Sequence, residues 1–224
     1  MHADNALLHL LQNALLLITY STSFKVTLMR SVLSHTTIIL TLSALLYIFQ
    51  ADSHQWLAYY HSGIQDGEWW RLITAHLCHT NGYHLLLNAA GLVVITSLFI
   101  HTFKTISLLS IFLFSSLFIS ACLYWFEPAV EWYVGLSGVL HALFAVGVCD
   151  EINKKDKWGA ILGLGLVLKI VFEQLNGASA STESLIGATV LINAHLYGAI
   201  AGLTYFLCLA IKQKIKKYKV SEQK

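Results

Sequence analysis

Residues 105–126 read TISLLSIFLFSSLFISACLYWF, a run without a single Asp, Glu, Lys or Arg. A helix that crosses a bilayer needs about 20 consecutive, mostly apolar residues, and this run is long enough. The whole chain shares the bias: 56% of its 224 residues are hydrophobic and 12% are charged, whereas soluble domains carry roughly 25% charged residues. The composition excludes a soluble globular protein and predicts an all-α, polytopic membrane protein.

Five further apolar stretches accompany this run and predict a bundle of six transmembrane helices. Together the six stretches cover 31–50, 83–100, 105–126, 134–149, 158–175 and 186–211. The fourth stretch is short, so its helix is expected to start below the outer membrane surface. The predicted parts of the chain are an N-terminal cytoplasmic extension at 1–30, a six-helix membrane domain at 31–211 and a basic cytoplasmic tail at 212–224.

The basic residues beside the spans predict the orientation of the chain in the lipid bilayer. If both termini are cytoplasmic, twelve of the fourteen Lys and Arg residues fall on the cytoplasmic side, as the positive-inside rule requires. Arg71 then stands on the outer side and Lys169 within a span. The formal net charge of +2 is small and is concentrated beside the apolar segments, so no nucleic-acid partner is indicated.

Polar residues inside the predicted spans need a partner or a water-filled cavity, which makes each a candidate for function. Their depth follows from the rise of a helix, about 1.5 Å per residue. On this scale Asn88, Ser137 and His195 lie roughly 20–25 Å from the inner ends of the second, fourth and sixth spans. In a hydrocarbon core about 30 Å thick, the three reach one level below the outer surface. A shared site is therefore predicted there.

The residue types at that level suit hydrolysis of an amide bond. A nucleophilic serine such as Ser137 needs a base, and His195 can take and return a proton at neutral pH. Asn88 and His84, one helical turn apart on one face, can donate hydrogen bonds to an oxyanion, as can the first amides of the helix that starts at the serine. No acid that would orient the imidazole is obvious in the sequence. A lone serine in a membrane helix more commonly bonds its own backbone.

Glycines accompany both the serine and the histidine. They are Gly135, Gly138, Gly198 and Gly202. The first two flank Ser137, and the last two follow His195 at the GxxxG spacing that lets membrane helices approach closely. If the sixth span packs on the fourth, the two polar side chains come within hydrogen-bond reach. Close helix packing is also the common structural use of this spacing, so a packing role and a catalytic role both predict contact between these two spans.

At these residues the sequence resembles the rhomboid intramembrane serine proteases, over about residues 31–211. Four ordered motifs carry the resemblance: ExWR at 68–71, HxxxxHxxxN at 79–88, GxSG at 135–138 and AHxxGxxxG at 194–202. The resemblance implies that Ser137 is the nucleophile and His195 the general base. It also implies an oxyanion hole made by His84, Asn88 and the serine amide. No metal and no cofactor is implied.

One residue narrows the resemblance to a branch of that family. His141 stands four positions after Ser137, where many rhomboids carry an aromatic residue that stacks on the catalytic imidazole. GxSGxxH resembles rhombosortase, a bacterial branch associated with exported substrates that bear a C-terminal GlyGly-CTERM membrane anchor, although Ala142 replaces its usual Gly. This implies cleavage of such anchors near the periplasmic face of the bacterial inner membrane. His141 either contacts His195 or satisfies a neighbouring helix.

Four more residues complete the candidates. By resemblance, Trp70 and Arg71 are structural and anchor the outer loop. Lys169 and Glu173 are four residues apart in the fifth span, hence on one helix face and able to form an intramembrane ion pair. Because a buried ion pair is costly to desolvate, this one is expected to specify packing or to touch the substrate path.

Two other classes of function compete with a protease. A non-catalytic rhomboid-like protein would bind or escort transmembrane clients, and replacement of Ser137 by Ala would leave client processing unchanged. A transporter or haem-binding protein would use some of the 11 histidines, but the inner ends of the spans lack paired histidines. The presence of both Ser137 and His195 favours the protease.

Overall fold

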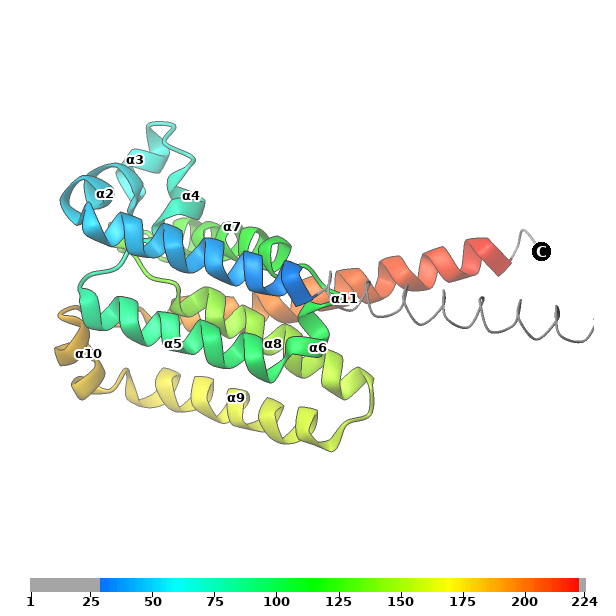
Figure 1. The fold of residues 1–224 in the computed structure, drawn as a ribbon. Coiled ribbons are helices and arrows are strands. Elements are labelled where there is room, and N and C mark those ends of the chain that lie inside the picture. The colour runs from blue at the N-terminus through cyan, green and yellow to red at the C-terminus, as the bar shows by residue number, and fades with distance from the viewer. Residues whose placement is uncertain (1–28, 222–224) are drawn as a thin grey trace, which may run out of the picture.

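The computed structural model describes residues 29–221, which form a helical bundle (Figure 1). Its elements are a first helix Met29–Ile48, α2 (Gln50–Leu57), β1 (Tyr59–Tyr60), α3 (His61–Gln65), α4 (Arg71–Thr74), η1 (Ala75–Leu77), α5 (Gly82–Leu98), α6 (Ile100–Phe103), α7 (Leu108–Phe126), β2 (Trp132–Tyr133), α8 (Ser137–Asn153), α9 (Lys157–Asn176), α10 (Ala180–Ile186) and α11 (Ile192–Ser221). The all-α class is confirmed, with one short strand pair among the described residues.

The helices are those of a multi-pass membrane protein. Four of them, namely Met29–Ile48, α7, α9 and α11, are long and apolar enough to cross a membrane alone. A fifth candidate combines α5 with the segment Arg71–Leu77, from which a bend of 94° separates it. The helix α8 has 17 residues and rises about 25 Å, so it is the short helix expected in the fourth position.

The fourth and sixth spans begin later than predicted, and the backbone shows why. The fourth span was expected from 134, but α8 begins at Ser137 because Gly135 has a φ of +128°, which a helix cannot contain. The sixth span was expected from 186, but α11 begins at Ile192. The segment before it contains α10, which was predicted as loop and which ends at Gly187 in the left-handed conformation.

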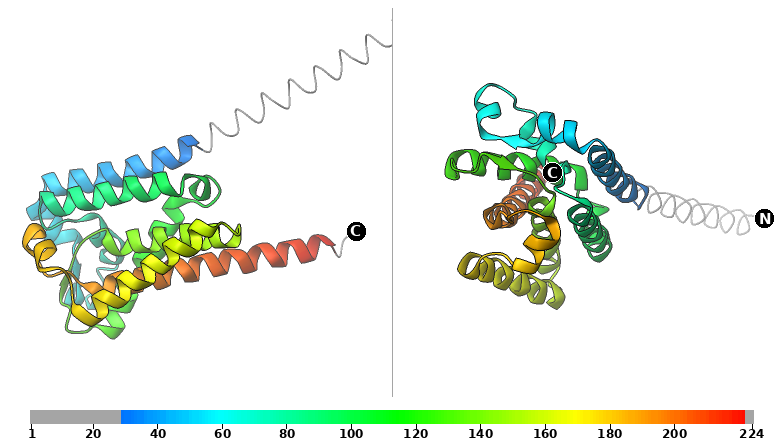
Figure 2. Two further views of the ribbon diagram at one scale, coloured as in Figure 1. Left: turned by 90° about the horizontal axis from the view of Figure 1, so that it is seen from below. Right: turned by 90° about the vertical axis from the view of Figure 1, so that its left-hand side faces the viewer.

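The short helix α8 occupies the middle of the bundle, where it packs against α5, α7, α9 and α11. Nine of its 17 residues are buried, whereas α9 at the edge buries two of its 20 residues, Gly159 and Ile170. The helix Met29–Ile48 and α9 lie on opposite sides of the bundle, as the end-on view shows (Figure 2). Apolar side chains such as Leu164 and Leu168 therefore face outward from α9, where lipid would surround them.

The two ends of the bundle are formed by different elements. The elements α2, α3, α4 and α10 lie at one end, and α6, the α8–α9 connection and the Lys-rich end of α11 lie at the other (Figure 1). At the first end β1 and β2 pair antiparallel, with Tyr59 opposite Tyr133. This pair was not predicted, because two-residue strands leave no periodicity in a sequence.

The predicted division of the chain is only partly within the described residues. Of the expected extension at 1–30, residues 1–28 lie outside them. The segment 212–221 continues α11 as one helix, so this part of the predicted tail is helical. The cytoplasmic placement of both segments stays a prediction.

Candidate active site

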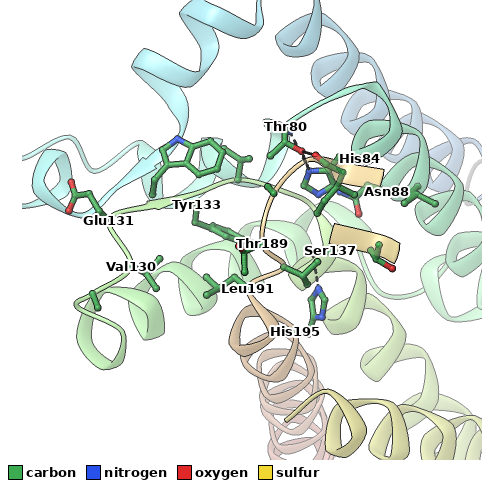
Figure 3. A pocket seen from close by; sticks show the side chains of 18 residues that line it. Thr80, His84, Asn88, Val130, Glu131, Tyr133, Ser137, Thr189, Leu191 and His195 are labelled. Carbon is green, nitrogen blue, oxygen red and sulfur yellow. Dashed lines mark hydrogen bonds between the residues drawn. The ribbon is translucent and has the colours of Figure 1, made fainter. Parts of the chain in front are cut away.

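Ser137 and His195 lie within hydrogen-bonding distance, with 3.0 Å between Oγ and Nε2 (Figure 3). Ser137 is the first residue of α8, and the left-handed backbone of Gly135 turns the chain into that helix. His195 lies in the first turn of α11 and is 6% exposed. Two helix N-terminal turns that are 58 residues apart in sequence thus meet at one point.

A contact between glycine and alanine residues holds these helices together, and we call it the glycine seam: Gly138 and Ala142 of α8 with Gly198 and Gly202 of α11. A Cβ atom at Gly198 would lie 2.0 Å from the carbonyl oxygen of Gly138. One at Gly202 would lie 2.3 Å from the carbonyl oxygen of Ala142. No side chain fits at either position, so the glycines permit the approach that brings the histidine to the serine.

The other ring nitrogen of His195 faces a carboxylate. Its Nδ1 lies 3.0 Å from Oε2 of Glu173, a residue of α9. The same oxygen accepts a hydrogen bond from Nζ of Lys169 at 2.7 Å. Lys169 and Glu173 thus form an ion pair, as their spacing indicates. The structure adds one feature that no sequence motif indicated: the carboxylate of this ion pair is an acid that lies beside the imidazole of His195.

His141 covers one face of the His195 ring. The two rings stack at 4.3 Å between centroids, with 16° between their planes. The Nδ1 atom of His141 lies 2.7 Å from the carbonyl oxygen of Ser137, one turn earlier in the same helix, and donates a hydrogen bond to it. Of the two roles left open by the sequence, the geometry has His141 in contact with His195.

His84 and Asn88 of α5 approach the serine from the side opposite His195 (Figure 3). The backbone amide of Thr80 donates to Nδ1 of His84 at 3.3 Å, which leaves the ring proton on Nε2. A Cβ built on Gly135 would lie 2.9 Å from this Nε2 and 3.9 Å from Nδ2 of Asn88. Both donors therefore lie beside the backbone that leads into Ser137.

The side-chain amide of Asn88 is the most informative of these groups. Its Nδ2 is buried and has no hydrogen-bond partner within the described part of the chain. An unsatisfied buried donor costs about 1–3 kcal/mol, and among the unpartnered atoms of the described residues only this one belongs to a cavity wall that also contains Ser137. A developing oxyanion next to Ser137 would supply an acceptor for this amide.

These groups line a cavity of about 550 Å³. Its wall includes Ser137, His195, His84 and Asn88 (Figure 3). Residues 129–134, two residues of α10 and residues 188–191 also line it. Pockets that bind drug-sized ligands typically have volumes of about 300–1,000 Å³. The cavity therefore has room for a short extended peptide segment against the serine.

Comparison with known proteins identifies the family of this chain. A family model described as "Rhomboid domain" matches residues 66–212, from the residue after α3 into α11. The chain belongs to the rhomboid family. It is 27% identical over 186 residues to "Putative rhomboid protease YdcA" of Bacillus subtilis (strain 168), which covers 80% of this chain and 90% of that protein. It is 26% identical over 185 residues to "Rhomboid-like protein 11, chloroplastic" of Arabidopsis thaliana, covering 76% and 64%.

The segment between the first helix and α5 is tied together by Trp70 and Arg71 in this rhomboid. Arg71 is 4% exposed and donates to the carbonyl oxygens of Ala58 at 2.7 Å and Gln55 at 2.9 Å. Trp70 donates through Nε1 to the carbonyl oxygen of Trp56 at 2.8 Å. Both side chains thus bond backbone from the segment that precedes them by some 13–16 residues and lie outside the cavity wall.

One group of side chains in this rhomboid has the spacing of metal ligands. Ligand atoms of His141, Glu173 and His195 lie within 4.8 Å of one another. The lone pairs of an imidazole lie in the ring plane, and the two stacked rings are nearly parallel, so these lone pairs do not converge on one point. The carboxylate oxygen is also shared already by Lys169 and His195. The arrangement suits proton transfer better than metal coordination.

Sequence reasoning missed two supporting residues. Thr80 holds the ring of His84 through its amide and has its Oγ 3.0 Å from the same Nδ1. Asn81 caps α5 by accepting the amide of His84 at 2.8 Å. The Asn before a helical run was a detectable capping signal, and a hydroxyl four residues before a candidate donor was a weaker one.

Proposed function

We propose that this rhomboid is an intramembrane serine endopeptidase in which Ser137 is the nucleophile and His195 the general base. The observation that carries the proposal is the 3.0 Å contact between Oγ and Nε2 at the wall of the cavity. A serine hydroxyl is a weak nucleophile unless a base removes its proton. The membrane-embedded helices leave few other uses for such a pair, since each polar group there costs free energy unless it is partnered.

The residues around the cavity have distinct roles in the reaction. Oγ of Ser137 attacks the substrate carbonyl carbon while Nε2 of His195 accepts the hydroxyl proton. The resulting oxyanion accepts hydrogen bonds from Nε2 of His84, Nδ2 of Asn88 and the amide of Ser137. His195 then protonates the leaving amine as the C–N bond breaks. Water, deprotonated by the same imidazole, hydrolyses the acyl-enzyme and restores the serine.

The proposed location is the bacterial inner membrane, with both termini cytoplasmic and the cavity open toward the periplasm. The clustering of lysines at the end of the bundle opposite α10 supports this orientation under the positive-inside rule. The wall of the cavity includes Thr182 and Ile186 of α10, so the cavity lies at the other end. Substrates would thus be cut at a shallow depth on the outer side.

The proposed substrates are C-terminally anchored exported proteins, in particular those with a GlyGly-CTERM anchor, as in rhombosortases. The contact between His141 and His195 supports this branch, because the GxSGxxH histidine occupies the stacking position. A substrate helix hides its amide bonds and must unwind before attack, and glycine lowers the free-energy cost of leaving the helix. A GlyGly-bearing anchor meets this requirement.

Co-expression tests the proposal directly. A reporter with a GlyGly-type C-terminal anchor should be shortened and released by the wild type, and not by the Ser137→Ala or His195→Ala variant. His101→Ala, at the exposed inner end of the bundle, is the matched histidine control and should process normally. Unchanged processing by Ser137→Ala would instead indicate a non-catalytic protein that binds or escorts clients. A second reporter with Leu-Leu at the GlyGly position tests the substrate class separately.

A further inference from the structure

Glu173 connects α9 to the proposed catalytic pair. Its Oε2 lies 3.0 Å from Nδ1 of His195, and Nε2 of the same ring lies 3.0 Å from Oγ of Ser137. Serine, imidazole and carboxylate thus stand in line, with the imidazole bonded at both nitrogens. This is the order of groups that a serine protease triad requires.

The position of this acid in the membrane is informative. Among the described residues of the six long helices, the other acidic side chains are Asp150 and Glu151, at the inner end of α8. Glu173 alone among these acids lies near the outer end of its helix, three residues from Asn176. A carboxylate within a span is costly and calls for a functional explanation.

An ion pair with Lys169 does not by itself explain the carboxylate. Both residues belong to α9, so their mutual contact joins no two helices. The bond that reaches another helix is the one to His195 on α11. The exposed fraction of the side chain falls from 46% for Lys169 to 15% for Glu173 and 8% for His195, so the lysine shields the carboxylate on its outer side while the histidine meets it from within.

We infer that Glu173 is a positioning residue for His195, which makes Ser137, His195 and Glu173 a triad with Lys169 as its counter-ion. This inference rests on the proposed protease function. The carboxylate accepts a hydrogen bond from Nδ1–H, which fixes the tautomer and directs the lone pair of Nε2 at the serine hydroxyl. When Nε2 takes the serine proton, Glu173 stays ionised and stabilises the imidazolium. The proton then leaves on the amine product, so the carboxylate is unchanged after each cycle.

Two substitutions that weaken the hydrogen-bond acceptor at residue 173 to different extents test this role. Glu173→Gln keeps an oxygen acceptor without the charge and should lower kcat about 10-fold, whereas Glu173→Ala removes the acceptor and should lower it about 100-fold. The KM value should not change, because Glu173 does not line the cavity. Lys169→Gln keeps the carboxylate and should lower kcat less than Glu173→Ala does. The matched control is Glu151→Gln, which breaks a Glu–Lys pair on α8 and should leave kcat unchanged.

The reaction of the serine with a fluorophosphonate probe separates this inference from the proposed function. The probe needs an activated hydroxyl but no peptide substrate. The Ser137→Ala variant is the control for labelling at Ser137. If the folded wild type reacts with the probe no more than this variant does, the protease proposal fails. If the wild type reacts and Glu173→Ala reacts at the same rate, with kcat also unchanged, the positioning role of Glu173 is overturned. Thermal unfolding of each variant in detergent supplies the folded fraction to which all rates are normalised.

Discussion

The two long faces of α8 are built differently. Against α11, the glycine seam brings backbone onto backbone, and a Cβ at Gly198 would lie 2.0 Å from a carbonyl oxygen. Against α9, close contact is confined to the end near the α8–α9 connection, where a Cβ at Gly159 would lie 2.7 Å from the amide nitrogen of Ile152. No atom of the described residues lies within 4 Å of a Cβ at Gly165, and a groove of about 380 Å³ opens there between α5, α8 and α9.

The difference separates two functions of the bundle. The seam fixes the distance between the helices that carry Ser137 and His195, and it leaves no room for change. We call the other face, where α5 and α9 flank α8, the open side, and it carries the polar groups Asn88, Thr80 and Glu173. Changes in the seam should therefore act on stability first, and changes of polar groups on the open side should act on rate.

The largest effect is expected from Gly198→Val in the seam. The branched side chain would overlap the backbone of Gly138, and neither helix can move away without separating the serine from the histidine. Overpacking of this kind costs typically 1–3 kcal/mol, and here about 3 kcal/mol or more, because the obstacle is backbone. Thermal unfolding in detergent measures the stability and reporter cleavage the activity. Wild-type values for both would show that the seam is not rigid.

Asn88→Ala on the open side should lower the rate of cleavage without lowering the stability of the protein. Loss of an oxyanion donor lowers kcat by about 10²–10³. The thermal stability should be unchanged or raised, because Nδ2 of Asn88 has no partner to lose among the described residues. The matched variant is Asn193→Ala, since Nδ2 of Asn193 donates to Glu127 at 2.6 Å. That variant should lose stability, and a stability loss of the same size in Asn88→Ala would argue against a donor kept for the reaction.

Thr80→Val should have a smaller effect on rate. It removes the hydroxyl that lies 3.0 Å from Nδ1 of His84 and that donates to the carbonyl oxygen of Ile186 at 2.6 Å. The bond that is lost is the one to Ile186, which helps to fix residue 80 beside the ring. The amide of Thr80 still holds the ring, so kcat should fall only about 10-fold, the equivalent of one hydrogen bond. Thr96→Val on α5, the helix that carries His84, removes a bond to its own backbone and should leave kcat as it was. Equal rates for the two variants would assign Thr80 a packing role alone.

Much of this comparison was visible in the sequence. The apolar runs predicted the helices, and the depth of Asn88, Ser137 and His195 predicted one level for them, because depth depends on a count of residues along a straight helix. The GxxxG spacing of Gly198 and Gly202 predicted a close helix contact. Each of these inferences rests on the geometry of a single helix, which is why a sequence can carry it.

The open side was less predictable, for a physical reason. Whether Glu173 reaches His195 depends on how α9 is rotated and placed against α11, and no local pattern encodes that. The same holds for Thr80, which acts through a ring four residues later and through α10 at Ile186. The helix α10 itself is seven residues long and rich in Ser and Thr, so its composition resembles that of a loop.

The smallest expected effect compares one substitution at two glycines. Gly165→Ala on the open side adds a methyl group where no atom of residues 29–221 lies within 4 Å, and it removes the conformational freedom that disfavours glycine in a helix. It should stabilise the protein by about 0.5–1 kcal/mol. Gly202→Ala in the seam gains the same helix propensity but places its methyl group 2.3 Å from the carbonyl oxygen of Ala142, so it should destabilise. A shift of the melting temperature in the same direction for both variants would mean that the two faces of α8 do not differ in the way their geometry indicates.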